Sequence, residues 1–167
     1  DTRVEHESSQ VLVLAPGGAV PLLTKITVGS ALRDPLLHAV LANGRGAMAR
    51  VRAAWGTIAS QYDALLAVNA DPRVPGDRQV FFTRCRAWLR YCDYSQAIDA
   101  SCLREFAITP DNTTAIWHFH VPCGMGRWAP ITFTLTLQRG RNRADLTITR
   151  TTEPPVDATL QATLLPP

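Results

Sequence analysis

Alternation of apolar and polar residues restricts the fold of this chain more than any other feature of its sequence. Apolar residues occupy every second position of 115–121 and 131–137, with mostly histidine or threonine between them, and a shorter copy covers 146–149. Successive side chains of a strand point to opposite faces, so this period indicates β-strands with one buried face. Antiparallel sheets produce such alternation, whereas buried parallel strands are continuously apolar. The turn sequence RGRN at 139–142 supports a hairpin.

The segment 79–92, QVFFTRCRAWLRYC, has the same period of two. One row is apolar and predicted to face the core: Phe81, Thr83, Cys85, Ala87, Leu89 and Tyr91. The other row is predicted to face outward and is mostly charged: Val80, Phe82, Arg84, Arg86, Trp88 and Arg90. We therefore expect one strand with an arginine-rich outer face.

Two apolar runs near the N-terminal end, 10–15 and 19–28, flank a Pro-Gly-Gly sequence and predict a pair of strands. Proline cannot donate a hydrogen bond to a sheet, so Pro21 either makes the second strand an edge strand or shortens it to 22–28.

The middle of the chain has a helical period. The positions that predict a long helix recur at steps of three and four: Ala47, Met48, Val51, Ala54, Trp55, Ile58, Tyr62, Leu65 and Leu66. Asn69 and Asp71-Pro72 are expected to end this helix. Residues 36–40 suggest one or two further helical turns. The expected fold is mainly β, an antiparallel β-sandwich-like domain with one long helix, of the α+β class.

The length of 167 residues, 46% of them hydrophobic, suits a single domain over 1–167. The chain starts at Asp1 without a methionine and is apolar up to its last residues, so we expect a fragment of a larger multidomain protein. The segment 153–167 is expected to be a linker or a truncated strand.

The charge pattern argues against nucleic acid and membrane partners. Net charge is only +3, and the arginines are spread along the chain instead of forming the basic patch that nucleic acid requires. No apolar run reaches the roughly 18 residues needed to span a bilayer. The four cysteines, Cys85, Cys92, Cys102 and Cys123, form no CxxC pair and are expected to be core thiols of a cytoplasmic protein, with a disulfide or a metal site as alternatives.

Sequence motifs give little support to a catalytic role. His118 and His120 share one strand face, a spacing that binds zinc in some proteins, and Cys123 is a conceivable third ligand. No fourth ligand follows, so neither a metal nor a cofactor is predicted, and a small metal-dependent enzyme using His118 and His120 stays an alternative. Gly124-Met125-Gly126 lacks the remainder of a dinucleotide-binding motif and is interpreted as a turn. No catalytic residue is predicted.

The predicted binding face combines Arg84, Arg86, Trp88 and Arg90 with His118 and His120. Sugars bind to flat aromatic rings flanked by planar hydrogen-bond donors, and this face supplies both. Two alternatives stay open: a solvent-facing strand whose arginine stems cover the tryptophan, or a face that contacts another domain.

Four short segments resemble one family. QYDALLAVN at 61–69, FTRCRAW at 82–88, YSQ at 94–96 and WHFHVP at 117–122 are similar to bacterial amylo-α-1,6-glucosidase-type glycogen debranching proteins, over about 47 to about 150. The resemblance implies a non-catalytic β-rich region of a glycoside hydrolase whose hydrolytic site lies in a separate helical barrel.

The resemblance also implies a function, that of an accessory domain, and it agrees with the cytoplasmic location expected from the cysteines. The expected partners are an α-glucan, such as glycogen or a maltooligosaccharide, other domains of the same chain, or both. The expected role is to bind polysaccharide or to position the catalytic domain. A purely structural scaffold between domains, without sugar binding, is the other reading.

Overall fold

A computed structural model describes residues 10–13, 22–34, 36–69, 71, 73–74, 76–91, 93–150 and 159–165. In 10–13, 22–26 and 159–165 only the backbone and its strand pairing are described, and for residue 33 only the backbone. The described residues form three antiparallel sheets and one short 3-10 helix, η1 (Gly29–Arg33).

The largest sheet has six strands in the order β1-β2-β9-β10-β11-β12. Their bounds are β1 Gln10–Val13, β2 Leu22–Val28, β9 Leu103–Ile108, β10 Thr114–Pro122, β11 Trp128–Leu137 and β12 Ala144–Arg150. The four-stranded sheet contains β3 His38–Ala42, β4 Met48–Arg52, β5 Ala64–Asn69 and β6 Arg78–Phe82. The three-stranded sheet has the order β13-β7-β8, from Thr159–Leu165, Arg84–Tyr91 and Tyr94–Ala97.

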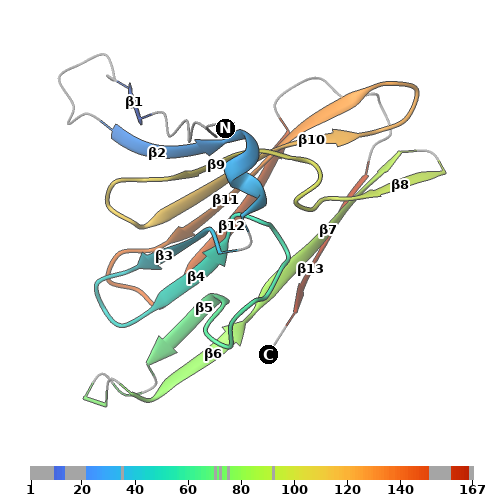
Figure 1. Ribbon diagram of the computed structural model, residues 1–167. Helices are drawn as coiled ribbons and strands as arrows, with labels where there is room; N and C mark the ends of the chain where they lie inside the picture. The colour runs from blue at the N-terminus through green and yellow to red at the C-terminus, as the bar shows by residue number, and fades with distance from the viewer. Residues whose placement is uncertain are drawn as a thin grey trace.

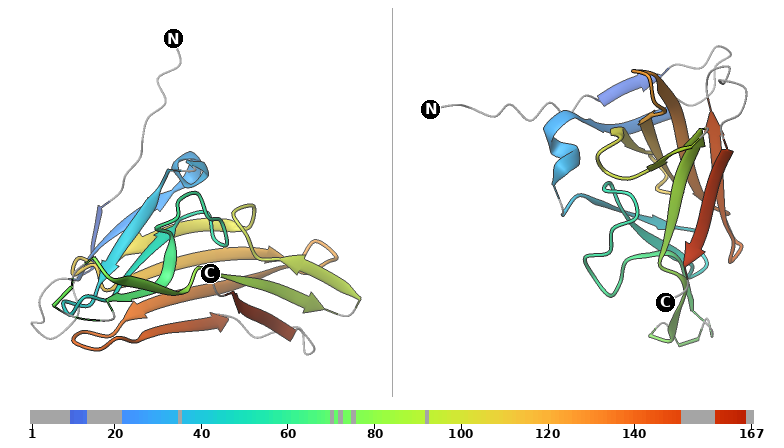
Figure 2. Two further views of the ribbon diagram at one scale, coloured as in Figure 1. Left: turned by 90° about the horizontal axis from the view of Figure 1, so that it is seen from below. Right: turned by 90° about the vertical axis from the view of Figure 1, so that its right-hand side faces the viewer.

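The sheets are arranged as a β-sandwich around one core. The four-stranded sheet lies in front of strands β10 to β12 of the six-stranded sheet, as Figure 1 and the right-hand view of Figure 2 show. Strand β6 runs directly into β7, so the chain passes from the four-stranded to the three-stranded sheet without a long connection (Figure 1). One cluster of buried side chains draws on all three sheets, which makes the described residues a single packed unit.

The predicted alternation in the second half of the chain is confirmed. The apolar rows of β10 and β11 are fully buried, and the residues between them are half-buried or exposed. Strands β11 and β12 form the predicted hairpin, and Gly140 in its turn has φ 68°, a conformation that glycine adopts without steric cost. Gly124-Met125-Gly126 is the turn between β10 and β11, as predicted.

The N-terminal strand pair is also confirmed. Strands β1 and β2 pair antiparallel, and β2 begins at Leu22, directly after Pro21. At the other end of the chain, the segment 159–165 is strand β13, which pairs antiparallel with β7. The prediction for 153–167 otherwise lies outside the described residues.

The prediction of one long helix is wrong, since the described residues contain no α-helix. Residues 48–52 and 64–69 are strands β4 and β5, with turns and irregular chain between them. Every second residue from position 47 to position 55 is buried: Ala47, Ala49, Val51, Ala53 and Trp55. The small alanines fit a period of two as well as one of 3.6, which concealed the strand. Gly56, with φ 77°, ends the run in a conformation incompatible with a helix.

Two smaller predictions fail in the same region of the molecule. Residues 38–42 form strand β3 in place of the expected helical turns at 36–40. The strand predicted over 79–92 is divided at Thr83 into β6 and β7, which belong to different sheets. Phe81, assigned to the core row, is therefore 50% exposed, whereas Cys85, Ala87 and Leu89 of the same row are buried in β7.

Aromatic rings form the centre of the core and join the sheets. The ring of Trp55, which follows β4, meets those of Trp117 in β10 and Phe133 in β11 edge to face, each at 4.8 Å between centroids. Trp117 also donates its indole N–H to the carbonyl oxygen of Arg52 at 3.1 Å. Such ring pairs add to the hydrophobic stabilisation, and the hydrogen bond satisfies the buried indole. The end of β4 is thus attached directly to the six-stranded sheet.

Replacing Trp55 with alanine is expected to lower the free energy of unfolding by about 3–5 kcal/mol, because it leaves a large cavity between the sheets. Trp128→Ala is the matched control: Trp128 is 54% exposed, so its removal is expected to change stability by no more than about 0.5 kcal/mol. Urea titrations followed by far-UV circular dichroism measure both. Equal effects of the two substitutions would contradict the assignment of Trp55 to the core.

Candidate functional site

The six residues predicted to form one binding face lie on two different sheets. Arg84, Arg86, Trp88 and Arg90 are on β7 of the three-stranded sheet, and His118 and His120 are on β10 of the six-stranded sheet.

The β7 row has the alternation that the sequence predicts, but its tryptophan is not a free platform. Arg86 and Arg90 are exposed, whereas Arg84 and Trp88 are half-buried. Trp88 lies directly opposite Ala97 of β8, in the middle strand of its sheet. A hollow of about 270 Å³ adjoins Arg86 and Trp88. This row is a basic surface beside a small hollow.

His118 lies on the outer face of the six-stranded sheet, where it has polar neighbours on both sides. Its register partners are Glu105 in β9 and Thr132 in β11. The Nδ1 atom lies 2.9 Å from the hydroxyl of Thr132, and Nε2 lies 3.6 Å from the Glu105 carboxylate. His120, two positions further on the same face, is exposed. The two histidines thus belong to a polar row that runs across three strands.

A β-bulge places an arginine on this same face. The pairing of β10 with β9 passes from His118 opposite Glu105 to Phe119 opposite Leu103, so Arg104 is the extra residue of β9. Leu103 and Phe106 both stay in the core, while Arg104 and Glu105 lie between them outside it. In a regular strand Arg104 would point into the core, and a bulge is the device that turns such a side chain outward.

The bulge brings Arg104 over an exposed tryptophan. Its guanidinium carbon lies 5.8 Å from the ring centroid of Trp128, at the start of β11. Trp128 is opposite Pro122 in the register, and His120 is opposite Pro130, so the tryptophan and His120 are diagonal neighbours on the outer face. We call Arg104, Glu105, His118, His120 and Trp128 the Trp128 surface.

Sequence reasoning found only the two histidines of the Trp128 surface. Trp128 could have been found from the alternation of β11, because it falls in the outward row with Pro130, Thr132 and Thr134. Arg104 could not, because its position depends on the bulge.

The geometry does not support the zinc site suggested by the histidine spacing. Cys123, the conceivable third ligand, is buried with the core, whereas His118 and His120 lie on the outer face. Within the described part of the chain, no three His, Cys, Asp or Glu side chains are grouped so that they could hold a metal ion. The thiols of Cys102 and Cys123 are free and buried, and the side chain of Cys92 lies outside the described residues.

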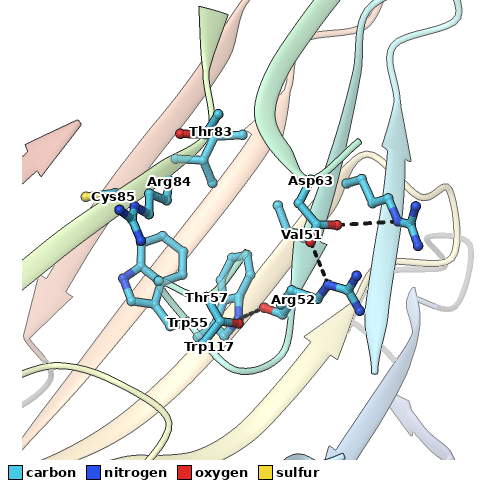
Figure 3. A pocket seen from close by; sticks show the side chains of 12 residues that line it. Val51, Arg52, Trp55, Thr57, Asp63, Thr83, Arg84, Cys85 and Trp117 are labelled. Atoms are coloured by element: carbon cyan, nitrogen blue, oxygen red, sulfur yellow. Dashed lines mark hydrogen bonds and ion pairs between the residues drawn. The ribbon is translucent and has the colours of Figure 1, made fainter. Parts of the chain in front are cut away.

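A buried ion pair fixes the loop between β4 and β5. Asp63 is 3% exposed and accepts a hydrogen bond at 2.9 Å from Nε of Arg52, which is also buried. The same carboxylate oxygen accepts the backbone N–H groups of Ala59 and Ser60, at 2.8 and 2.9 Å. Figure 3 shows Arg52 and Asp63 beside the rings of Trp55 and Trp117. The adjoining crevice holds only about 20 Å³, too little for a sugar or cofactor, so this network is structural.

Burial has the largest single effect on the Asp63 carboxyl and acts to raise its pKa, since it disfavours the charged form. The hydrogen bond from Arg52, the backbone N–H groups of Ala59 and Ser60, and the charge of Arg52 all act in the opposite direction. Together they hold the pKa of Asp63 below its ordinary value of 3.8. The folded state therefore favours the ionised carboxylate.

The described helical segments include none that is long and apolar enough to cross a membrane.

Asp63→Asn is expected to lower stability at pH 7 by about 3–5 kcal/mol, because it leaves Arg52 buried without its counter-charge. The depressed pKa of Asp63 contributes stability that is fully present above 3.8 and is lost as the pH falls through the lower folded-state value. The difference in stability between the wild type and Asp63→Asn should accordingly shrink below pH 4. Urea midpoints at pH 7, 5 and 3 measure this difference, and a constant difference would contradict the pKa assignment.

Comparison with family models matches most of the chain. A family model described as the N-terminal region of glycogen debranching enzyme matches residues 38–165, which include strands β3 to β13. Neither the curated proteins nor the solved structures contain a significant match. The match agrees with the resemblance of the short segments in the sequence. The chain belongs to the family of glycogen debranching enzyme N-terminal domains.

Proposed function

We propose that this domain is a non-catalytic accessory domain of a glycogen debranching hydrolase and that it binds α-glucan chains on the Trp128 surface. The family supports the substrate class. The observation that carries the proposal is the exposed ring of Trp128, with Arg104 packed near it and hydrogen-bonding side chains beside it.

The chemistry of the surface fits a sugar chain. The indole ring offers a flat apolar face for the C–H groups of a pyranose, and Arg104 donates N–H groups in one plane. Glu105 accepts hydrogen bonds, and the imidazoles of His118 and His120 can do either. These groups lie on three adjacent strands of a packed sheet, so they are held in place before a ligand arrives.

Binding suits this surface better than hydrolysis does. Glycoside hydrolysis generally requires two carboxyl groups on either side of the scissile bond. Glu105 is the carboxylate of the Trp128 surface, and it lies 3.6 Å from His118 in an ion-pair arrangement. The catalytic step is accordingly assigned to another domain of the parent protein.

We propose a second role, domain positioning, for the β7 row. Arg86 and Arg90 are exposed and form no ion pair with the described residues, so they are available to acidic groups of a neighbouring domain. The hollow of about 270 Å³ beside Arg86 and Trp88 can take a single protein side chain. Arginine and tryptophan are enriched in such interfaces.

We also propose a cytoplasmic location for the domain. The free, buried thiols of Cys102 and Cys123 are typical of a reducing compartment and support this assignment.

Trp128→Ala is expected to weaken retention in a native gel containing glycogen by about tenfold, equivalent to about 1.4 kcal/mol. Arg104→Ala should have a smaller effect in the same direction, because it removes donors but leaves the ring. Phe81→Ala is the matched control, since it removes an exposed aromatic ring from a different sheet. Wild-type retention in the Trp128→Ala variant would disprove the role of this surface.

Reversing the charges of the β7 row tests domain positioning. In the full-length debranching protein, the double substitution Arg86→Glu and Arg90→Glu is expected to loosen the attachment of this domain, because acidic partners would then be repelled. Limited proteolysis should release the domain several times faster than from the wild type, with glycogen retention of the domain unchanged. An unchanged cleavage rate would exclude an interdomain role for Arg86 and Arg90.

A further inference from the structure

A second pocket lies on the outer face of the four-stranded sheet. It has a volume of about 440 Å³, within the usual range of small-molecule sites. Met48, Ala67 and Val80 line it from the sheet, and Gln61, Tyr62 and Arg78 line it from the loop before β5 and the start of β6. Neither the predicted binding face nor the Trp128 surface includes any of these residues.

The floor of this pocket is an apolar row across three strands. Met48 of β4 is opposite Ala67 of β5, and Ala67 is opposite Val80 of β6, so the three share one face. The neighbouring residue of β4, Ala49, is in the core, which places the row on the outside of the sandwich. The Trp128 surface belongs to the outer face of the six-stranded sheet, and the right-hand view of Figure 2 shows the two sheets as separate layers.

The wall of the pocket is an aromatic ring held in a fixed loop. Tyr62 is 62% exposed. Its backbone N–H donates to the Ser60 hydroxyl at 3.2 Å, and the next residue is the buried Asp63. Because Asp63 also binds the N–H groups of Ala59 and Ser60, the loop is fixed from within. The hydrogen bonds of this network do not involve the Tyr62 side chain, so the ring can contact a ligand. The loop that carries the ring is ordered before the ligand binds.

Two polar side chains complete the pocket. Within the described part of the chain, the side chains of Gln61 and Arg78 make no hydrogen bond or ion pair. The site thus offers an apolar floor, one aromatic ring, one amide and one guanidinium. A neutral sugar ring has the matching features, an apolar face and a rim of hydroxyls. A multiply charged ligand such as a phosphate would meet only one cation and an apolar floor.

We propose that this pocket is a second α-glucan subsite, which takes one or two glucose units at the end of a chain. Tyr62 stacks on the sugar ring, and Gln61 and Arg78 bind its hydroxyls. The identity of the ligand rests on the proposed function, whereas the location of the site rests on the pocket itself. A branched polymer can then contact the domain on two different sheets.

The test maps binding of maltose to the isotope-labelled 167-residue chain by amide chemical shifts. We expect shifts at Met48, Gln61, Ala67 and Val80, and a loss of maltose affinity of about tenfold in Tyr62→Ala. Tyr62→Phe keeps the ring and should retain most of the affinity, whereas Arg78→Ala should weaken it.

Met125→Ala serves as the control and should leave the shifts at the pocket unchanged, because Met125 is 92% exposed in the turn between β10 and β11. Trp128→Ala removes the other proposed surface and tests whether the pocket binds maltose independently of it. Thermal unfolding verifies that each variant is folded, and the exposed Tyr62 side chain makes a loss of fold unexpected.

The outcomes separate this inference from the proposed function. Shifts only at Arg104, His120 and Trp128 would overturn the pocket and leave the proposed function standing. If maltose causes no shift and glycogen still retains the chain, the pocket proposal is also overturned and the proposed function stands. If the wild-type chain neither shifts with maltose nor is retained by glycogen, both proposals fail. Pocket shifts that Tyr62→Ala abolishes and Trp128→Ala preserves would establish the second subsite.

Discussion

The hydrogen bond from the Trp117 indole to the carbonyl of Arg52 joins the two halves of the sandwich, and much of the structure depends on it. It attaches the end of β4 to the middle of the six-stranded sheet and directs the following residues, up to Trp55, into the core. The guanidinium of the same Arg52 then pairs with Asp63. The backbone of Arg52 therefore binds a core tryptophan, and its side chain stabilises the loop before β5.

This arrangement explains why a charged pair is buried in a domain that has enough apolar residues for its core. A buried ion pair rarely adds stability compared with apolar residues of the same size, so its retention calls for another reason. Here the carboxylate of Asp63 gathers two backbone N–H groups as well as Arg52. The result is a loop of fixed shape, and an apolar pair could not have bound those N–H groups.

The sequence predicted the strands more reliably where large side chains alternate than where alanines do. In β10 and β11, Trp117, Phe119 and Phe133 alternate with polar residues, and burial of such rings allows only one interpretation. In β4 and directly after it, Ala49 and Ala53 are too small to distinguish a strand from a helix, and Gly56 was the residue that marked the end of the run. The division at Thr83 was equally concealed, because the run 79–92 contains no glycine or proline to mark it.

The candidate site was less accessible to sequence reasoning than the fold. The outward direction of His118 and His120 follows from alternation alone, and so does that of Trp128 once β11 is extended to its first residue. The proximity of Arg104 to Trp128 does not follow from alternation. It results from a bulge, which depends on the pairing of two strands and leaves no trace in the sequence of either one. The predicted face also combined two sheets, since alternation assigns a residue to a side of a strand but not to a neighbour.

On the proposed assignment, two binding surfaces on the outer faces of two different sheets would have a physical consequence for a branched polymer. Each surface exposes one aromatic ring and a few polar groups, so each would bind a glucan segment weakly. Once one branch were held, another branch of the same molecule would be present near the second surface at high effective concentration, and the combined affinity would exceed that of either site. A short linear oligosaccharide cannot reach both surfaces, because the packed core separates them. On the proposed assignment, the domain would therefore distinguish large branched glucans from short linear ones by geometry, without any contact specific to the branch point.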